Sequence, residues 1–277
     1  MKGVLLVNKE EGYTSRDIVN IISKKFNTKK VGHFGTLDPL ATGLLVIGIG
    51  KYTKIGNFLE EDTKEYECEV LIGKSTDTYD ITGTVLEEKA CIVDKDSLEK
   101  VLRSFKKTYV QEVPIYSAVK VKGKKLYEYA REGKEVELPK KQVTIYDINL
   151  ISFNKNTFKF KCLVSKGTYI RSIINDISKE LNIPMCMKSL NRTVQDKFYI
   201  EDSYTLKDIE NNNYKLLTID DIFDIKRVEV TKDIENLVFN GNKLNISLDG
   251  MIVFTKDDKD IALYKSDNKN LEYVMFL

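Results

Sequence analysis

A continuous apolar run at residues 44–49 (LLVIGI) limits the folds open to this chain, because such a run needs cover on both of its faces. Runs of this kind form strands inside sheets that helices flank. The loop before it, residues 32–43, is rich in glycine and contains the pair Asp38-Pro39. The sequence therefore predicts a mixed α/β (α+β) protein in which a polar loop is delivered beside a buried strand.

Helical and strand periods alternate along the rest of the chain. Apolar residues spaced by three and four positions predict amphipathic helices at residues 15–26, 96–105 and 170–181. Alternating or continuous apolar residues predict strands at residues 3–7, 64–73, 143–152 and 157–164. Thr14 or Ser15 is expected to cap the first helix.

The pattern changes after about residue 225, where short strand-like segments are separated by turns at NGN and LDG. A length of 277 residues leaves room for one sizeable core and a smaller module. We therefore expect a catalytic domain at residues 1–225 and a small β domain at residues 226–277.

Charge and cysteine usage exclude several classes of protein. Lys plus Arg (44) barely exceed Asp plus Glu (42), so a nucleic-acid signal must be local. The segment 119–141 is the local candidate, with eight Lys or Arg against four Glu and with Tyr127 and Tyr129 interleaved. Four isolated cysteines and one histidine predict neither a disulfide nor a metal site.

No run approaches the ~18–20 apolar residues of a membrane span, so a cytoplasmic enzyme or binding protein is expected. The segment GIGKYT suggests a phosphate-binding loop, but the spacing fails. The P-loop pattern requires glycine where Leu45 stands and Ser or Thr where Tyr52 stands.

The residues around Asp38 describe a carboxylate presented rigidly on a loop. Pro39 disfavours the α region for Asp38, and the neighbouring glycines allow a ligand to approach the backbone closely. A turn-forming Asp-Pro pair is the competing interpretation. Arg171 lies off the apolar face of its predicted helix and, by itself, suggests a solvated side chain. Tyr66 is in phase with the apolar face of its strand and suggests a core residue.

Residues 32–43, GHFGTLDPLATG, resemble the signature GHxGTLDPxATG of the TruB family of tRNA pseudouridine synthases. Four further blocks agree with that family in order and spacing. They are NKEEGYTS at 8–15, KEY at 64–66, YSAVKVKGKKLYEYAREG at 116–133 and SKGTYIRSI at 165–173. The resemblance covers most of residues 1–200, and the C-terminal segment is similar, more weakly, to a reduced PUA-like domain.

The resemblance implies a pseudouridine synthase fold, with a central mixed sheet flanked by helices, and an RNA-gripping insertion at about residues 114–142. It implies an isomerase that converts the uridine at position 55 in the tRNA T loop to pseudouridine after flipping that base out of the loop. The implied partner is the T arm of tRNA. No metal, cofactor or protein partner is implied, and a monomer is expected.

Site residues follow from the resemblance by motif position. The implied catalytic residues are Asp38 as nucleophile, Arg171 as the cation paired with it, and Tyr66, which stacks on the target base. The implied substrate-binding residues are His33, which fills space vacated in the RNA loop, Tyr66, Tyr169, which holds the flipped uridine, and Leu190, which walls the uracil pocket. Taken alone, His33 suggests a hydrogen-bonded loop residue, Tyr169 a helix-capping aromatic and Leu190 core packing. The atom that Asp38 attacks first stays open.

Two positions depart from the family pattern. Glu10 stands where proline is usual, which predicts a less rigid entry to the first block. Phe34 replaces a small or polar residue and either packs under the loop or stacks on RNA.

Two other functions compete with a stand-alone tRNA enzyme. One is the same chemistry inside a guide-RNA particle, as in dyskerin-like relatives. We expect those relatives to carry a fuller C-terminal domain and basic tails, whereas this sequence ends in LEYVMFL. The other is a non-catalytic RNA-binding module, which would not need both Asp38 and Arg171.

Overall fold

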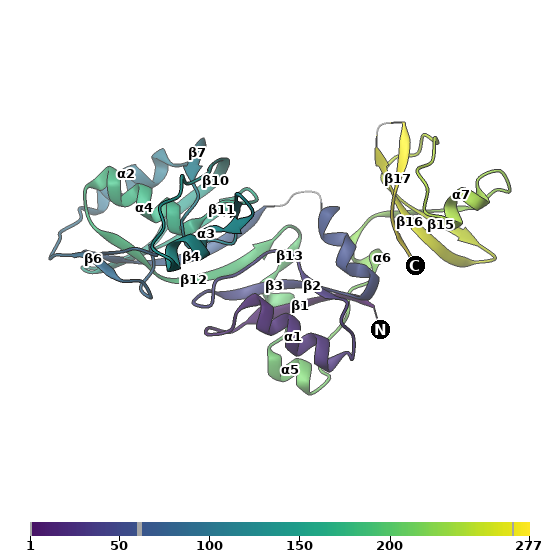
Figure 1. The fold of residues 1–277 in the computed structure, drawn as a ribbon, viewed down its shortest axis with the longest axis horizontal. Helices are drawn as coiled ribbons and strands as arrows, with labels where there is room; N and C mark the ends of the chain where they lie inside the picture. The colour runs from purple at the N-terminus through teal and green to yellow at the C-terminus, as the bar shows by residue number, and fades with distance from the viewer. Residues whose placement is uncertain (1, 60–62, 268) are drawn as a thin grey trace. The chain divides into compact units, whose positions relative to one another are not determined.

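The computed structural model describes residues 2–59, 63–267 and 269–277. The chain divides into two compact units, both built from strands and helices (Figure 1). The first unit comprises Met1–Asp38, Leu45–Glu60 and Glu201–Leu277, and the second comprises Pro39–Leu44 and Glu61–Ile200. The predicted mixed α/β (α+β) class is confirmed.

The first unit contains the N-terminal strands and the helices that cover them. Its elements before the C-terminal sheet are β1 (Gly3–Lys9), α1 (Ser15–Lys25), β2 (Val31–His33), β3 (Thr42–Ile49) from Leu45 onward, η1 (Gly50–Asn57), α5 (Leu206–Glu210) and α6 (Ile219–Ile222). Strand β3 has β1 as one neighbour and pairs antiparallel with β2. The predicted buried run, residues 44–49, is buried throughout, as continuous apolar sequence requires.

Helix α1 begins where the sequence provides a cap. Thr14 is the N-cap residue, and its hydroxyl accepts a hydrogen bond from the Asp17 N–H at 3.0 Å. The Asp17 carboxylate in turn accepts from the Thr14 N–H at 2.8 Å, which completes a capping box. Of the two predicted caps, Thr14 is therefore the one used. The apolar face of the helix buries Ile18, Val19 and Ile22.

The C-terminal part of the first unit is a four-stranded sheet. Its order is β14 (Ile225–Glu229), β15 (Met251–Lys256), β16 (Lys259–Asp267) and β17 (Asn270–Phe276). The sheet has its own apolar core around Ile252, Phe254 and Tyr264. A short helix, α7 (Glu235–Phe239), packs on β16 and was absent from the sequence prediction. The predicted C-terminal β-sheet domain is confirmed.

The second unit is built on a mixed sheet. Strands β12 (Met185–Gln195), β4 (Lys64–Ile72), β11 (Thr157–Val164), β10 (Lys140–Phe153) and β7 (Thr108–Glu112) follow one another as antiparallel neighbours. The first residues of β3 pair with β12 in parallel, and β13 (Phe198–Tyr199) pairs with β12 in antiparallel orientation. The predicted strands at residues 143–152 and 157–164 lie in β10 and β11, which form an antiparallel pair.

Two helices cover this sheet. Helices α2 (Lys95–Ser104) and α4 (Ile170–Leu181) pack against each other, and both pack on strands of the sheet (Figure 1). Both were predicted from apolar spacing, and the observed bounds differ from the predicted ones by no more than one residue. A small hairpin, β5 (Lys74–Thr76) with β6 (Val85–Glu88), lies beside β12.

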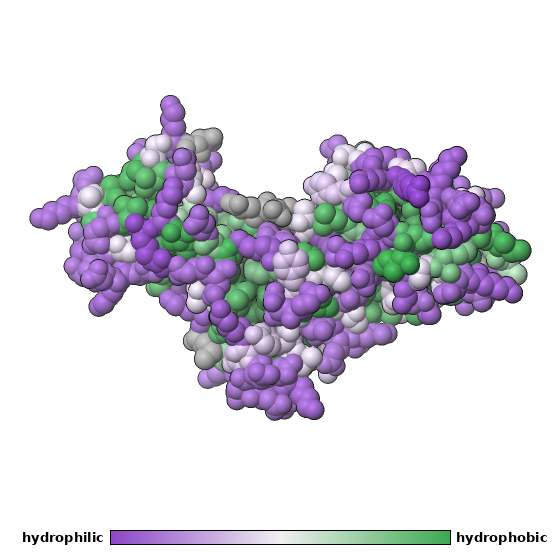
Figure 2. All heavy atoms as spheres, turned by 180° about the vertical axis from the view of Figure 1, so that it is seen from behind, coloured by the Kyte–Doolittle hydropathy of each residue, from purple (hydrophilic) through white to green (hydrophobic). Residues whose placement is uncertain are grey.

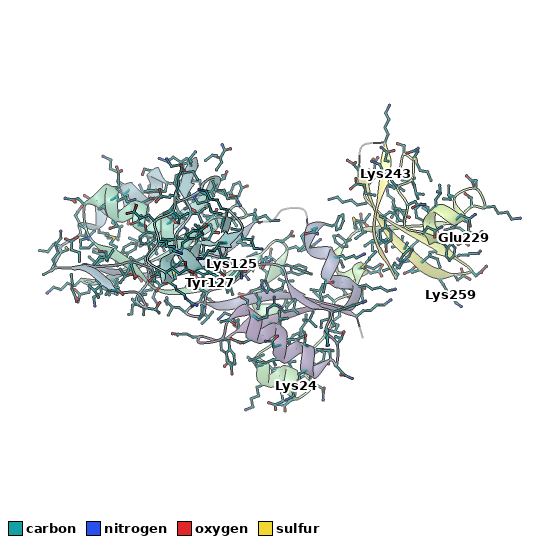
Figure 3. The ribbon with its side chains drawn as sticks, in the orientation of Figure 1. Lys24, Lys125, Tyr127, Glu229, Lys243 and Lys259 are labelled. Carbon is teal, nitrogen blue, oxygen red and sulfur yellow. The ribbon has the colours of Figure 1, made fainter. Side chains whose placement is uncertain are left out.

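The basic insertion is folded. It contains the two-residue strands β8 (Lys120–Val121) and β9 (Lys124–Lys125), followed by α3 (Leu126–Arg131). Lys122 (φ 50°) and Gly123 (φ 82°) form the turn between the strands, as a tight hairpin requires. The Lys125 ammonium donates to the Tyr127 hydroxyl at 3.2 Å, and these two side chains are labelled in Figure 3.

Hydrophilic residues cover most of the face drawn in Figure 2, with hydrophobic residues exposed in scattered patches. Within the described residues, no helix has the length and apolar character that crossing a membrane requires.

Candidate active site

The loop that carries Asp38 leaves the first unit's sheet at β2. His33, the last residue of β2, pairs with Ile47 of β3, and the Phe34 N–H donates to the Val46 carbonyl at 2.9 Å. After Phe34 the chain has no regular secondary structure until β3, so this loop needs other partners for its backbone groups.

Ser15 of α1 is the partner for the residue before Asp38. Its hydroxyl donates to the Leu37 carbonyl at 3.0 Å and accepts from the Leu37 N–H at 2.8 Å. Ser15 is 2% exposed and Leu37 is 3% exposed, whereas Asp38 remains partly exposed. The loop is thus anchored in the core one residue before the carboxylate. The sequence did not single out Ser15 for this position, because nothing local signals a contact with a loop far along the chain.

The ring of Phe34 packs under the loop. A Cβ atom added to Gly56 would lie 2.5 Å from the ring, and one added to Gly48 would lie 2.7 Å from it. Both glycines therefore leave space that the ring occupies. The ring therefore packs against β3 and η1, which agrees with the packing alternative for Phe34.

The first block is held together by Lys9 and not by a proline. Lys9 is fully buried, and its ammonium donates to the carbonyls of Glu10 and Tyr13 at 3.0 and 2.7 Å. These bonds close the turn that leads into α1. Glu10 therefore does not leave this entry loose, in contrast to the prediction from the missing proline.

The segment that follows Asp38 belongs to the second unit, where it docks on β12. Thr42 and Gly43 pair with Asn191 and Arg192 of that strand. Gly43 has φ 99°, and a Cβ atom there would lie 2.4 Å from the Arg192 carbonyl oxygen. The fully buried Arg192 reaches back to donate to the Leu44 carbonyl at 2.7 Å. Glycine at position 43 is thus required by both the backbone angle and the close approach.

Tyr66 and Leu190 lie on one face of the β4–β12 pair. Leu190 stands opposite Cys68, and Tyr66 stands opposite Arg192. Residues two apart along a strand share a face, so Tyr66 and Leu190 are diagonal neighbours. Tyr66 and Leu190 are each 7% exposed. A buried position fits a core tyrosine and also fits an aromatic wall that a flipped base would cover.

Arg171 is buried and hydrogen-bonded, so it is not the solvated arginine that its helix position alone suggests. It is 6% exposed, and its guanidinium donates to the carbonyls of Thr78 at 3.1 Å and Tyr116 at 3.0 Å. The Asp80 carboxylate lies 3.8 Å from the Arg171 Nη1 atom. Two fixed carbonyls aim a planar guanidinium in a way that lysine cannot reproduce.

Asp80 is a buried carboxylate that the sequence did not single out. One of its oxygens accepts from the hydroxyls of Thr78 and Thr82 at 2.9 and 2.5 Å and from the Thr82 N–H at 2.9 Å. The neighbouring Tyr116 donates its hydroxyl to Asp77 at 3.0 Å, and this hydrogen bond raises the pKa of Tyr116. The side chains on both sides of Arg171 are therefore held in place.

Tyr169 precedes Arg171 at the N-cap of α4, where its own side chain makes no cap. Gln111 of β7 holds it instead. The Gln111 amide accepts from the Tyr169 N–H at 2.8 Å and donates to the Tyr169 carbonyl at 3.2 Å. Gln111 is 1% exposed, and its amide also donates to the Tyr109 hydroxyl at 2.8 Å. The start of the helix that presents Arg171 is thus fixed by a side chain from the sheet.

Tyr109 links this contact to a carboxylate on α4. Its hydroxyl donates to Asp176 at 3.2 Å. Burial raises the pKa of Tyr109, and the negative charge of Asp176 adds to that effect. Burial also raises the pKa of Asp176, and the Tyr109 hydrogen bond only partly offsets the rise.

The predicted site residues are divided between the units. His33 and Asp38 belong to the first unit, while Tyr66, Tyr169, Arg171 and Leu190 belong to the second. Within the second unit, strand register brings Tyr66 beside Leu190, and the start of α4 brings Tyr169 beside Arg171. No group of three or more His, Cys, Asp or Glu side chains in the described parts of the chain is arranged to hold a metal ion.

Comparison with known proteins identifies a family by sequence and a shared fold by structure. The model of the TruB family pseudouridylate synthase N-terminal domain matches residues 23–170. This range includes four of the six predicted site residues, all except Arg171 and Leu190.

Curated relatives share the match over most of their length. The tRNA pseudouridine synthase B of Caldanaerobacter subterraneus subsp. tengcongensis is 43% identical over 86% of this chain and 85% of its own. The protein of the same name from Mesoplasma florum is 37% identical over 97% of this chain and 95% of its own. The one from Acholeplasma laidlawii is 48% identical over 76% of this chain and 75% of its own.

Solved structures share the fold. A crystal structure of a Cbf5-Nop10-Gar1 complex contains a chain that matches with a TM-score of 0.68 and 22% identity. The match covers 99% of this chain and 83% of that one. The structure of an H/ACA RNP bound to a substrate RNA containing 2'-deoxyuridine matches with a TM-score of 0.67, 20% identity and the same coverage.

Proposed function

Because the chain belongs to the TruB family of pseudouridylate synthases, we propose that it isomerises the uridine at position 55 in the tRNA T loop, with Asp38 as nucleophile. The observation that carries this proposal is the setting of Asp38. It is the carboxylate of the GTLDP motif, it stays partly exposed, and the residue before it is anchored in the core. A nucleophile needs this combination of access and fixed position.

A carboxylate suits the reaction because it can form a transient bond with the nucleotide and then leave. The bond between the sugar carbon and N1 of uracil breaks, the base rotates, and a bond from the same sugar carbon to C5 forms. The proton on C5 is lost to water, and N1 takes up a proton, so the product is an isomer of the substrate. The pathway requires no oxidant or reductant.

Arg171 is the proposed cation that keeps Asp38 ionised. A base that covers the carboxylate excludes water, and desolvation alone would disfavour the charged form. A guanidinium stabilises a carboxylate through paired hydrogen bonds. The burial of Arg171, together with its two carbonyl partners, supports this role, since the charge is oriented in advance.

The proposed binding site for the flipped base combines Tyr66 as a stacking surface with Leu190 as a wall. Their common face on β4 and β12 supports this pairing. Stacking of a base on an aromatic ring contributes about 1–3 kcal/mol. Tyr169 is proposed to hold the same uridine, and His33 to occupy space that the extruded bases leave.

The T arm of tRNA is the proposed partner, and the insertion at residues 114–142 is proposed to contact its phosphates. Lys120 and Lys122 are exposed on the β8–β9 hairpin, which supports that contact. We also propose a catalytic domain at residues 1–225 and a PUA-like domain at residues 226–277, a monomeric state without a required protein partner, and a cytoplasmic location.

The guide-RNA alternative is disfavoured by the pattern of similarity. The structural matches to chains from Cbf5 and H/ACA complexes are at 20–22% identity and carry the fold alone. The relatives at 37–48% identity carry the name tRNA pseudouridine synthase B. The test is turnover by the purified chain on a tRNA transcript without added guide RNA. A stand-alone enzyme turns over under these conditions, and a guide-dependent enzyme does not.

Tritium release from tRNA transcripts labelled at uracil C5 tests the proposal. We expect the wild type to release tritium and Asp38→Asn to release none, while the variant still binds the transcript. Asparagine keeps the shape of the side chain but cannot act as a carboxylate nucleophile. A transcript with cytidine at position 55 should release none with either protein.

Asp94→Asn is the matched control, because the same exchange occurs at an exposed helix N-cap where asparagine also serves. It should keep wild-type turnover. Release of tritium by Asp38→Asn at the wild-type rate would refute the role of Asp38 as nucleophile. Release from the cytidine-55 transcript would refute position 55 as the modified position.

A further inference from the structure

Ser15 is a buried hydroxyl whose hydrogen bonds the helix itself does not need. The cap of α1 is completed by Thr14 and Asp17, which bind each other's backbone N–H groups. Ser15 therefore does not serve as the cap. Its hydroxyl instead contacts a loop that lies 22 residues away in the sequence.

Both hydrogen bonds of this hydroxyl go to Leu37. The Ser15 Oγ atom donates to the Leu37 carbonyl and accepts from the Leu37 N–H, so it satisfies both backbone groups of that residue. Leu37 lies in a stretch without regular secondary structure, between β2 and β3. The hydroxyl thus satisfies the backbone N–H and carbonyl of Leu37, as hydrogen bonds to a neighbouring strand would in a sheet.

The Leu37 carbonyl belongs to the peptide bond that joins Leu37 to Asp38. This peptide group is planar, so fixing its oxygen also fixes the direction in which the chain enters Asp38. On the other side, Pro39 restricts the backbone of Asp38 to extended conformations. The backbone on both sides of the carboxylate is therefore constrained, and Ser15 supplies a tertiary side-chain contact on the Leu37 side.

We infer that Ser15 is a positioning residue for Asp38, an inference that rests on the proposed role of Asp38 as nucleophile. It holds the nucleophile loop in register with the reacting carbon and does not touch the substrate. Displacement of a reacting group by about 1 Å costs on the order of 100-fold in rate. Loss of the Ser15 contact should therefore act on the chemical step more than on binding.

The test is single-turnover tritium release at saturating enzyme, together with the Kd for the tRNA transcript. For Ser15→Ala we expect the rate to fall by about 10- to 100-fold, with Kd changed by less than about threefold. Ser15→Thr retains the hydroxyl and should recover most of the lost rate. Ser23→Ala makes the same exchange later in the same helix at a partly exposed position and should match the wild type.

Thermal unfolding of each variant separates positioning from loss of the fold. If Ser15→Ala is not folded at the assay temperature, Ser15→Cys replaces it under the same criteria, because a thiol has a similar shape and is a weak hydrogen-bonding group. A folded variant without the hydroxyl that turns over at the wild-type rate overturns the inference. So does a variant that keeps the wild-type rate and loses affinity only.

Asp38→Asn in the same assay distinguishes the two proposals. If Asp38→Asn is inactive and Ser15→Ala has the wild-type rate, only the role of Ser15 is wrong. If Asp38→Asn itself turns over, the nucleophile assignment fails, and the inference about Ser15 fails with it.

Discussion

At the level of single residues, the proposed site depends on positions where the backbone conformation and the close packing allow only one residue type. Gly43 is the sharpest case, since it combines a left-handed backbone angle with a contact too close for any Cβ atom. Its neighbours Asn191 and Arg192 lie on β12, the strand that also carries Leu190. A strained residue at this position would therefore disturb the wall of the proposed uracil pocket.

For Gly43→Ala we predict a loss in the free energy of unfolding larger than the angle alone explains. The left-handed conformation costs an L-residue roughly 1–2 kcal/mol, and the clash with β12 adds to it. Urea unfolding measures the total. Gly250→Ala is the matched control, because its φ is 89° and no atom lies within 4 Å of an added Cβ. Equal losses for the two variants would show that the contact with β12 does not matter.

At the scale of elements, the start of α4 is positioned by the sheet and not by its own sequence. Without a side-chain cap from Tyr169, the helix start is held by Gln111 from β7. This is the element that presents both Tyr169 and Arg171. The carbonyl groups that orient Arg171 come from other segments again, so the site is assembled from several elements.

Gln111→Met is predicted to lower both stability and turnover. Methionine has a similar length but cannot accept from the Tyr169 N–H, whereas the Tyr169 carbonyl keeps the Ile173 N–H as a donor. Loss of a hydrogen-bond partner by a buried group costs about 1–3 kcal/mol. The measurements are urea unfolding and single-turnover tritium release. Gln142→Met, at an exposed position on the neighbouring strand β10, serves as control. If Gln111→Met had the stability of the wild type, the hydrogen bonds from Gln111 to Tyr169 would not stabilise the start of α4.

For the molecule as a whole, the net charge of +2 does not show where the charged side chains gather. In the insertion, Glu132 pairs with Lys124 at 2.5 Å and with Lys134 at 2.9 Å, so some of the positive charge is offset within the arm. Arg131 lies over the Tyr127 ring at 5.3 Å. Lys120 and Lys122 are exposed on the hairpin and present their charge outward.

Binding of the tRNA transcript is predicted to weaken as salt rises, because each phosphate contact releases counterions. Replacing both Lys120 and Lys122 with alanine should lower the slope of log Kd against log salt by about one for each residue. Lys24→Ala, at an exposed position in the last turn of α1, should leave the slope unchanged. An unchanged slope for the double variant would remove the hairpin from the RNA contact.

Residues and local pattern were enough to predict the class of fold and the family. They also predicted the helices α1, α2 and α4 and the strands β1, β3, β4, β10 and β11. Apolar spacing sets which face of α1, α2 and α4 is buried, and it does so within each element. The GTLDP and GTYIR motifs are contiguous, so they too are visible without a structure. The strand β12, the short helix α7 and the two-residue strands β8 and β9 were missed. Elements as short as α7, β8 and β9 do not repeat a helical or strand pattern often enough for it to be recognised.

The contacts that hold the motif residues depend on how distant parts of the chain pack together. Ser15 meets Leu37 across 22 residues, and Arg171 meets the carbonyls of Tyr116 and Thr78 across 55 and 93 residues. These contacts use backbone groups that every residue possesses, so no sequence letter marks them. They arise when packing brings distant segments together and buried polar groups must find partners. The family motifs in the sequence therefore indicated which residues to propose for the site, and the packing of the chain determined what holds those residues in place.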